Sequence, residues 1–160
     1  LKSEVERCVR EQLKEKFGGE TTVMTLGGPQ VVEAMRTALA MGIDKGVRID
    51  DPTLKDADGW GTAKALSAAL KQLNLDLIMG GKQAIDGDYA QVMAYVAELL
   101  DLPQVYNISK MEMAGDGKSA TVSRRIEGGE EALTSTLVLW EVAWVLIQTR
   151  EPRESDSVGS

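Results

Sequence analysis

The sequence predicts an α/β protein with a doubly wound, mostly parallel sheet and a C-terminal antiparallel hairpin. Short apolar runs rich in β-branched residues alternate with segments whose apolar residues recur every three or four positions. Glycines mark several of the transitions between these two patterns. After Pro103 the alternation gives way to strand-like runs separated by short turns, which is typical of an antiparallel hairpin.

The first third of the chain predicts a helix, a strand, a second helix and a second strand. Apolar residues four positions apart indicate an amphipathic helix that ends at the glycine pair 18–19. The β-branched run 21–26 predicts a strand. The turn 27–29 leads into the next helix, because its proline suits a first helical turn. That helix is expected to end at Gly42, and residues 46–50 predict the second strand.

The middle of the chain repeats the alternation. Residues 61–73 carry leucines at helical spacing and predict a helix. The apolar run 75–79 predicts a buried strand, and the periodic segment that ends near Asp101 predicts a further helix. Alternating strands and helices are expected to give parallel strands joined by crossover helices.

The last third predicts the hairpin and a change of organisation. Residues 105–113 and 120–126 are expected to pair around a glycine-rich turn, and a strand is expected over 132–139. We expect residues 1–139 to form one nucleotide-binding domain, and residues 140–160 to form a divergent strand and a disordered tail. Because the chain begins with a helical pattern, the first strand of the doubly wound sheet is expected to be absent.

The most informative segment is 80–91, a glycine-bearing loop between the strand at 75–79 and the next helix. Such a turn directs unpaired backbone N–H groups and the positive end of the helix dipole toward one point. That arrangement binds phosphate. The turn 27–29 follows another strand at the same carboxyl edge, where parallel sheets bind their ligands. The sequence therefore predicts a nucleotide site between the two loops.

Several side chains of this loop admit more than one function. Asp86 and Asp88 could serve as paired carboxylates for acid–base chemistry or magnesium binding, but acidic residues at a helix start more often cap it. We therefore favour capping and loop shaping over a direct nucleotide contact, and both over catalysis. Lys82 is interpreted as an exposed loop lysine rather than as a phosphate ligand.

Composition excludes several classes of function. The formal net charge of −7 argues against a general nucleic-acid binder. The chain has no histidine, which excludes serine-histidine and cysteine-histidine nucleophile systems within it. Its single cysteine, Cys8, excludes an internal disulfide or a cysteine-rich metal site. No apolar run reaches the roughly 20 residues that span a bilayer, and a soluble intracellular compartment is expected.

The loop and segments on either side of it resemble a known protein family. In combination these segments resemble the beta subunit of electron transfer flavoprotein over roughly residues 3 to 136. The resembling strings are Gln83-Ala84-Ile85-Asp86-Gly87-Asp88, Ala90-Gln91-Val92, Leu99-Leu100-Asp101-Leu102-Pro103-Gln104, Arg36-Thr37-Ala38-Leu39-Ala40-Met41-Gly42, Arg125-Ile126-Glu127-Gly128-Gly129 and Glu151-Pro152-Arg153.

The resemblance implies an adenine-nucleotide alpha-hydrolase-like fold and a heterodimer of alpha and beta subunits. The beta subunit would have no catalytic residues of its own. It would hold a structural AMP, or a second FAD in electron-bifurcating members, and it would share the redox FAD borne by the alpha subunit. The pair would pass electrons from flavin dehydrogenases, such as the acyl-CoA dehydrogenases of fatty acid oxidation, to an acceptor. The expected compartment is the bacterial cytoplasm or the mitochondrial matrix, with no nucleic-acid partner and no stable membrane insertion.

The resemblance also implies which residues bind the nucleotide. They are Gly27, Ala84, Ile85, Asp86, Gly87, Asp88, Tyr89, Ala90, Gln91, Val92 and Met93. Family members commonly have a small polar residue in place of Tyr89 and glycine in place of Met93. A bulky Met93 would obstruct the close approach of a phosphate to the backbone. The alternatives are an adenine-nucleotide-binding domain with hydrolase-type activity and a domain that binds no nucleotide.

Overall fold

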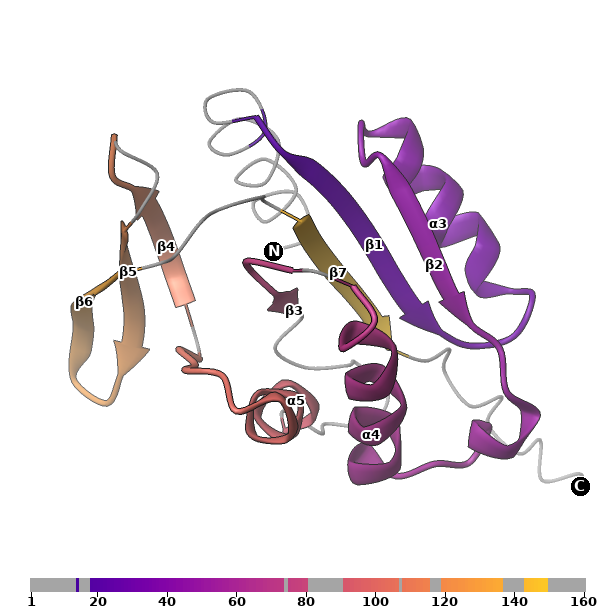
Figure 1. The fold of residues 1–160 in the computed structure, drawn as a ribbon. Helices are drawn as coiled ribbons and strands as arrows, with labels where there is room; N and C mark the ends of the chain where they lie inside the picture. The colour runs from indigo at the N-terminus through magenta and orange to yellow at the C-terminus, as the bar shows by residue number, and fades with distance from the viewer. Residues whose placement is uncertain are drawn as a thin grey trace, which may run out of the picture.

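The computed structural model describes residues 14, 18–73, 75–80, 91–106, 108–115, 119–136 and 143–149. These residues form a four-stranded parallel sheet and a separate three-stranded antiparallel sheet, with helices packed beside the parallel sheet (Figure 1). The predicted α/β class and the predicted antiparallel hairpin are confirmed.

The parallel sheet has the strand order β2-β1-β7-β3. β2 (Lys45–Ile49) and β3 (Met79–Gly80) lie at its edges, and β1 (Glu20–Leu26) and β7 (Ala143–Thr149) lie inside it. β7 runs parallel to both of its neighbours and pairs with β1 over all 7 of its residues. Strands from opposite ends of the described chain are therefore hydrogen-bonded to each other at the centre of the sheet (Figure 1).

β7 lies between β1 and β3 in the sheet. The expected absence of a first strand would have left the facing edges of β1 and β3 without partners. In the structure Thr22 is opposite Val145 on one side of β7, and Met79 is opposite Leu146 on the other. The strand edges of β1 and β3 that face β7 thus have hydrogen-bond partners.

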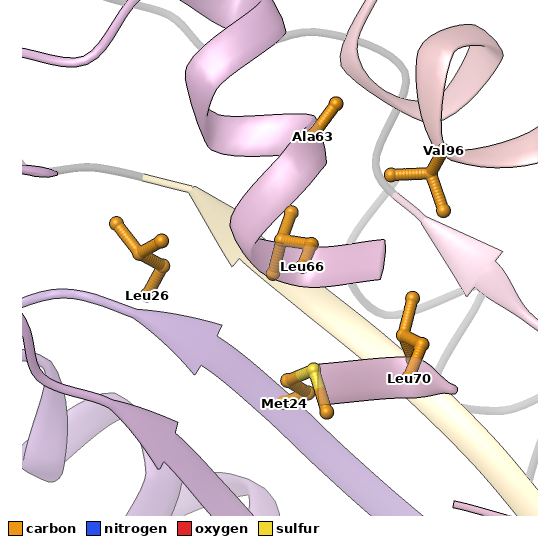
Figure 2. Packing of buried hydrophobic residues seen from close by; sticks show 6 residues of the cluster. All are labelled: Met24, Leu26, Ala63, Leu66, Leu70 and Val96. Carbon is orange, nitrogen blue, oxygen red and sulfur yellow. The ribbon is translucent and has the colours of Figure 1, made fainter. Parts of the chain in front are cut away.

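α4 (Gly59–Leu70) and α5 (Val92–Leu100) pack against one face of β1. Asp58 caps the start of α4, because its Oδ1 accepts a hydrogen bond of 2.7 Å from the backbone N–H of Gly61. The buried apolar cluster between these helices and the sheet consists of Met24, Leu26, Ala63, Leu66, Leu70 and Val96 (Figure 2). α4 follows a short 3₁₀ turn, η2 (Pro52–Leu54).

α3 (Val31–Ala40) packs on the opposite face. A Cβ built on Gly46 of β2 would lie 2.8 Å from Met35 Cε and 3.8 Å from Val23 Cγ1. Since side chains alternate along a strand, Val23 points away from the face that carries Met24. The helices therefore cover both faces of the sheet. α3 ends at Ala40, two residues before the predicted end at Gly42, and Gly42 has a φ of +100°, the left-handed conformation that follows many helix C-termini.

The predicted strand over 75–79 is wrong in extent. Only Met79 and Gly80 form β3, and they pair with Leu146 and Ile147 of β7. The described residues 75–78 are not in strand conformation. A short apolar run indicates burial but does not by itself determine ladder pairing. Residues 143–145 of β7 lie at the height of residues 76–78, yet among the described strands they pair only with β1.

The antiparallel sheet has the order β4-β5-β6. Its strands are β4 (Ile108–Met113), β5 (Ser119–Ile126) and β6 (Gly129–Thr136), so the last strand begins earlier than the predicted 132–139. The tight turn between β5 and β6 uses Gly128 at φ +94°, a conformation that glycine adopts without strain. Arg124 of β5 lies directly opposite Glu131 of β6 and forms an ion pair of 2.7 Å with it.

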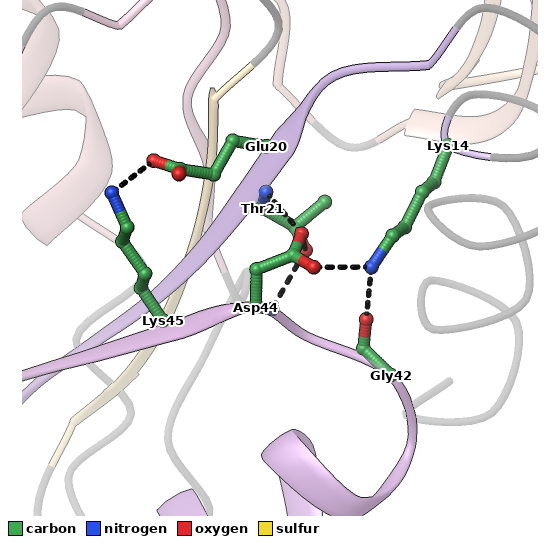
Figure 3. Close-up of polar contacts among 6 residues, drawn as sticks. All are labelled: Lys14, Glu20, Thr21, Gly42, Asp44 and Lys45. Carbon is green, nitrogen blue, oxygen red and sulfur yellow. Dashed lines mark hydrogen bonds and ion pairs between the residues drawn. The ribbon is translucent and has the colours of Figure 1, made fainter.

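A polar network ties the start of β1 to the segment before β2 (Figure 3). Asp44 Oδ2 accepts hydrogen bonds from the backbone N–H of Thr21 at 2.9 Å and from its hydroxyl at 2.7 Å. Lys14 Nζ lies 2.6 Å from Asp44 Oδ1 and donates to the carbonyl of Gly42 at 2.6 Å. The Lys14 ammonium and the Thr21 hydroxyl lower the pKa of Asp44 from 3.8 to about 2.

We expect Asp44→Asn to lower the free energy of unfolding at pH 7, because the amide does not reproduce the ion pair with Lys14. The pKa of Asp44 is depressed in the folded state, so its contribution is fully present above pH 4 and is lost as the pH falls toward 2. The gap between variant and parent should therefore close over that range in denaturant titrations. Asp56→Asn, at an exposed carboxylate, is the matched control. A gap that persists unchanged at pH 2 would contradict this account.

We expect Leu66→Ala to destabilise the protein by about 2–5 kcal/mol, as large-to-small substitutions in a closed core do. Leu66 is fully buried between α4, α5 and β1. The control is Leu102→Ala, at a leucine that is 45% exposed, which should change stability far less. Urea unfolding measured by circular dichroism gives both values. Equal effects of the two substitutions would show that the cluster around Leu66 is not the core.

Candidate functional site

The candidate site lies at the carboxyl edge of the parallel sheet. β1 and β7 end at the same height, because Leu26 is opposite Thr149. β2 ends beside them, with Ile49 opposite Leu26 and its carbonyl accepting a 3.0 Å hydrogen bond from the backbone N–H of Gly27. In sheets of this kind the crevice beyond the strand ends is where ligands bind.

Gly27 begins the turn between β1 and α3 and has close neighbours. A Cβ built on Gly27 would lie 2.6 Å from Cγ1 of Val31, in the first turn of α3. A Cβ on Gly28 would lie 2.5 Å from Oε1 of Gln30. Glycine at position 27 therefore lets the start of α3 pack directly over the end of β1, which leaves the turn backbone close to the sheet edge.

Gly80 ends β3 on the other side of β7. A Cβ built on Gly80 would lie 2.6 Å from Cε of Met93 and closer still to its Sδ and Cγ. Met93 is the second residue of α5 and packs against the apolar core cluster. Its thioether therefore lies directly over the backbone of Gly80, in the space that a larger residue at position 80 would occupy.

Side-chain contacts connect the start of α5 to the start of α4. Tyr95 donates a hydrogen bond of 2.8 Å from its hydroxyl to Oε1 of Gln91, the residue before α5. The rings of Tyr95 and Trp60 meet edge to face, with centroids 5.3 Å apart. Lys64 Nζ lies 5.3 Å from the centroid of Trp60, a cation–π distance. This cluster was not predicted from the sequence, although Trp60 and Lys64 are one helical turn apart and share a helix face.

The structure describes four of the residues that the sequence proposed for nucleotide binding. Gly27 lies at the end of β1, and Gln91, Val92 and Met93 lie at the start of α5. Met93 also contacts Gly80, which the sequence analysis had not placed among the binding residues. The proposed residues that lie outside the described part of the chain, along with Lys82, are Ala84, Ile85, Asp86, Gly87, Asp88, Tyr89 and Ala90.

The described residues contain no group of three histidine, cysteine, aspartate or glutamate side chains placed to hold a metal ion. None of the described helices is long and apolar enough to cross a membrane. Among the described residues, the glycine turn at the sheet edge offers backbone groups to a ligand. Gly27 and Gly28 form one glycine turn there, and Gly80 ends the strand on the far side of β7.

The fold and the sheet edge define an α/β domain with a glycine-turn site, and comparison with known proteins gives its family. The model of the electron transfer flavoprotein domain matches residues 11–149. The chain therefore belongs to the electron transfer flavoprotein family, and the resemblance inferred from the sequence is confirmed.

The similar curated proteins include electron transfer flavoprotein beta subunits and a subunit of a reductase-Etf complex. The chain is 42% identical over 132 residues to the electron transfer flavoprotein subunit beta of Thermoanaerobacterium thermosaccharolyticum, covering 82% of this chain and 49% of that protein. The match to the Bacillus subtilis subunit beta is also 42%, over 129 residues, covering 80% and 49%. The caffeyl-CoA reductase-Etf complex subunit CarD of Acetobacterium woodii is 39% identical over 120 residues, covering 74% and 45%. The chain spans about half the length of these relatives.

We expect Gly80→Ala to lower the melting temperature, because the new methyl group must displace Met93. Overpacking of this kind costs about 1–3 kcal/mol. Combining it with Met93→Ala should recover much of that loss, since the smaller side chain leaves room for the methyl group. The control is Gly115→Ala, where a Cβ has no heavy atom within 4 Å. Strictly additive effects of the two substitutions would show that Gly80 and Met93 do not share this space.

Proposed function

We propose that this chain acts as the nucleotide-binding part of an electron transfer flavoprotein beta subunit. The observation that carries the proposal is the family match over residues 11–149, which includes the whole parallel sheet and both loops at its carboxyl edge. We further propose that the sheet is of the doubly wound, adenine-nucleotide alpha-hydrolase-like type. Helices on both faces and the parallel order β2-β1-β7-β3 support that classification.

The proposed ligand is an adenine nucleotide, a structural AMP, held at the carboxyl edge of the sheet. Gly27 and the start of α5 at Gln91 and Val92 would flank it, with the loop 84–90 supplying the remaining contacts. The glycine turn fits a ligand bound through backbone groups, because no side chain at position 27 stands between the ligand and the chain. A second FAD in the same place is the alternative, as in an electron-bifurcating member.

The proposed partner is an alpha subunit that bears the redox FAD, so the functional unit is a heterodimer. FAD, when bound, would supply the electron chemistry, and this chain would act as a carrier subunit without catalytic residues of its own. Electrons would come from flavin dehydrogenases and pass to an acceptor. The name of the Acetobacterium woodii relative, a subunit of a caffeyl-CoA reductase-Etf complex, is consistent with such an assembly. The bacterial relatives favour the cytoplasm as the compartment.

Identification of the nucleotide released from the purified chain tests the binding proposal. The full chain is denatured and the supernatant is separated by liquid chromatography, with expected release of about one AMP per chain. FAD in place of AMP would favour the electron-bifurcating alternative. The chain should also co-purify with a family alpha subunit when the two are co-expressed. Absence of any bound nucleotide, together with no binding of added AMP or FAD, would contradict the proposal.

A further inference from the structure

Both carbonyl groups of Gln91, the residue before α5, are held by Tyr95. The backbone carbonyl of Gln91 accepts a hydrogen bond of 3.0 Å from the backbone N–H of Tyr95. The side-chain Oε1 accepts a second one of 2.8 Å from the Tyr95 hydroxyl. Within the described residues 91–100, no hydrogen bond joins the Gln91 side chain to the N–H groups of the first turn of α5. The amide of Gln91 is therefore turned toward Tyr95 and does not cap its own helix.

Tyr95 is in turn restrained by the start of α4. Its ring meets the ring of Trp60 edge to face, with centroids 5.3 Å apart. A Cβ built on Gly59 would lie 4.0 Å from Cε2 of Tyr95, so the tyrosine ring lies beside the first turn of α4. Asp58 caps that turn through its hydrogen bond to the backbone N–H of Gly61. The hydroxyl that binds the glutamine amide thus belongs to a ring whose position is set by the packing of two helices.

The direction of this hydrogen bond decides which part of the Gln91 amide is available to a ligand. A side-chain amide has one acceptor oxygen and an NH₂ group that donates. Tyr95 binds the oxygen, so Nε2 and its N–H groups face away from Tyr95. A donor suits an acceptor atom of a nucleotide, such as a phosphate or ribose oxygen. Because the side chain is already ordered, a ligand that accepts from it does not have to pay for fixing its rotamer.

We propose that Tyr95 is a positioning residue of the nucleotide site, which fixes the Gln91 side-chain amide as a hydrogen-bond donor to the bound nucleotide. This inference rests on the proposed nucleotide-binding function, in which the start of α5 flanks the ligand. Tyr95 acts through Gln91 and does not itself contact the nucleotide. Removing its hydroxyl therefore weakens binding only while the Gln91 amide is present.

The test is a double-mutant cycle on the full chain, freed of bound nucleotide by unfolding and refolding. AMP binding is measured by isothermal titration for the parent, Tyr95→Phe, Gln91→Ala and the double variant. Tyr95→Phe keeps the ring against Trp60 and should raise the dissociation constant about three- to tenfold, the effect expected when one flexible side chain must be ordered on binding. Gln91→Ala should raise it at least as much. The double variant should match Gln91→Ala within about twofold, because the hydroxyl then has no amide to position.

Two further measurements separate positioning from a general effect on the fold. Tyr106→Phe is the matched control, since Tyr106 is 69% exposed and its ring lies beside Arg124 of β5, and it should leave the dissociation constant unchanged. Thermal melts identify any variant that fails to fold. If Gln91→Ala fails, Gln91→Met replaces it, because methionine keeps the length of the side chain without the amide. If the parent binds FAD and not AMP, the same cycle is measured with FAD.

The outcomes distinguish this inference from the function on which it rests. A parent that binds the nucleotide, with Tyr95→Phe within about twofold of it, overturns the inference and leaves the proposed function standing. An equal loss from Tyr95→Phe in the presence and absence of the Gln91 amide also overturns the inference, because Tyr95 would then act by another route. If neither the parent nor any variant binds AMP or FAD, both the inference and the proposed function are overturned.

Discussion

The parallel pairing of β7 with β1 and β3 is the constraint on which the rest of the structure depends. Without β7 the strands β1 and β3 would not belong to one sheet, since each is hydrogen-bonded to β7 and not to the other. α4 and α5 share a core with β1 because this sheet is continuous beneath them. The carboxyl edge beside Gly27, and the position of Gly80 opposite Ile147, two residues before the end of β7, follow from the same pairing.

The local elements could be predicted from the sequence because their signals are local. Helical spacing of apolar residues predicts α3, α4 and α5, and the turn glycines predict where β1 and β5 end. The position of β7 could not be predicted in this way. A divergent strand is predicted within the segment 140–160 that contains it, but strand order depends on contacts between distant segments. The extent of β3 could not be predicted either, since only Met79 and Gly80 of its apolar run pair with β7.

Only some residues of the candidate site could be predicted from the sequence. Gly27 and the start of α5 were accessible to sequence reasoning, because a glycine between a strand and a helix has a known effect on the backbone. The position of Met93 over Gly80 and the edge-to-face contact of Trp60 with Tyr95 were not. Both contacts join different elements, and only the packing of α5 against β3 and α4 brings those residues together. Such side chains change the shape of a site whose position is set by the backbone.

The pairing of β1 with β7 has a consequence for how the chain is made. A ribosome synthesises residues 20–26 long before residues 143–149, the last described segment. Until β7 has been made, the edge of β1 that pairs with it has no partner. Contacts between such distant segments form slowly, because a long loop must close first. During that interval β1 carries an open, apolar strand edge of the kind that promotes aggregation. We therefore expect the nascent chain to depend on chaperones more than a domain of this size with local strand pairing would.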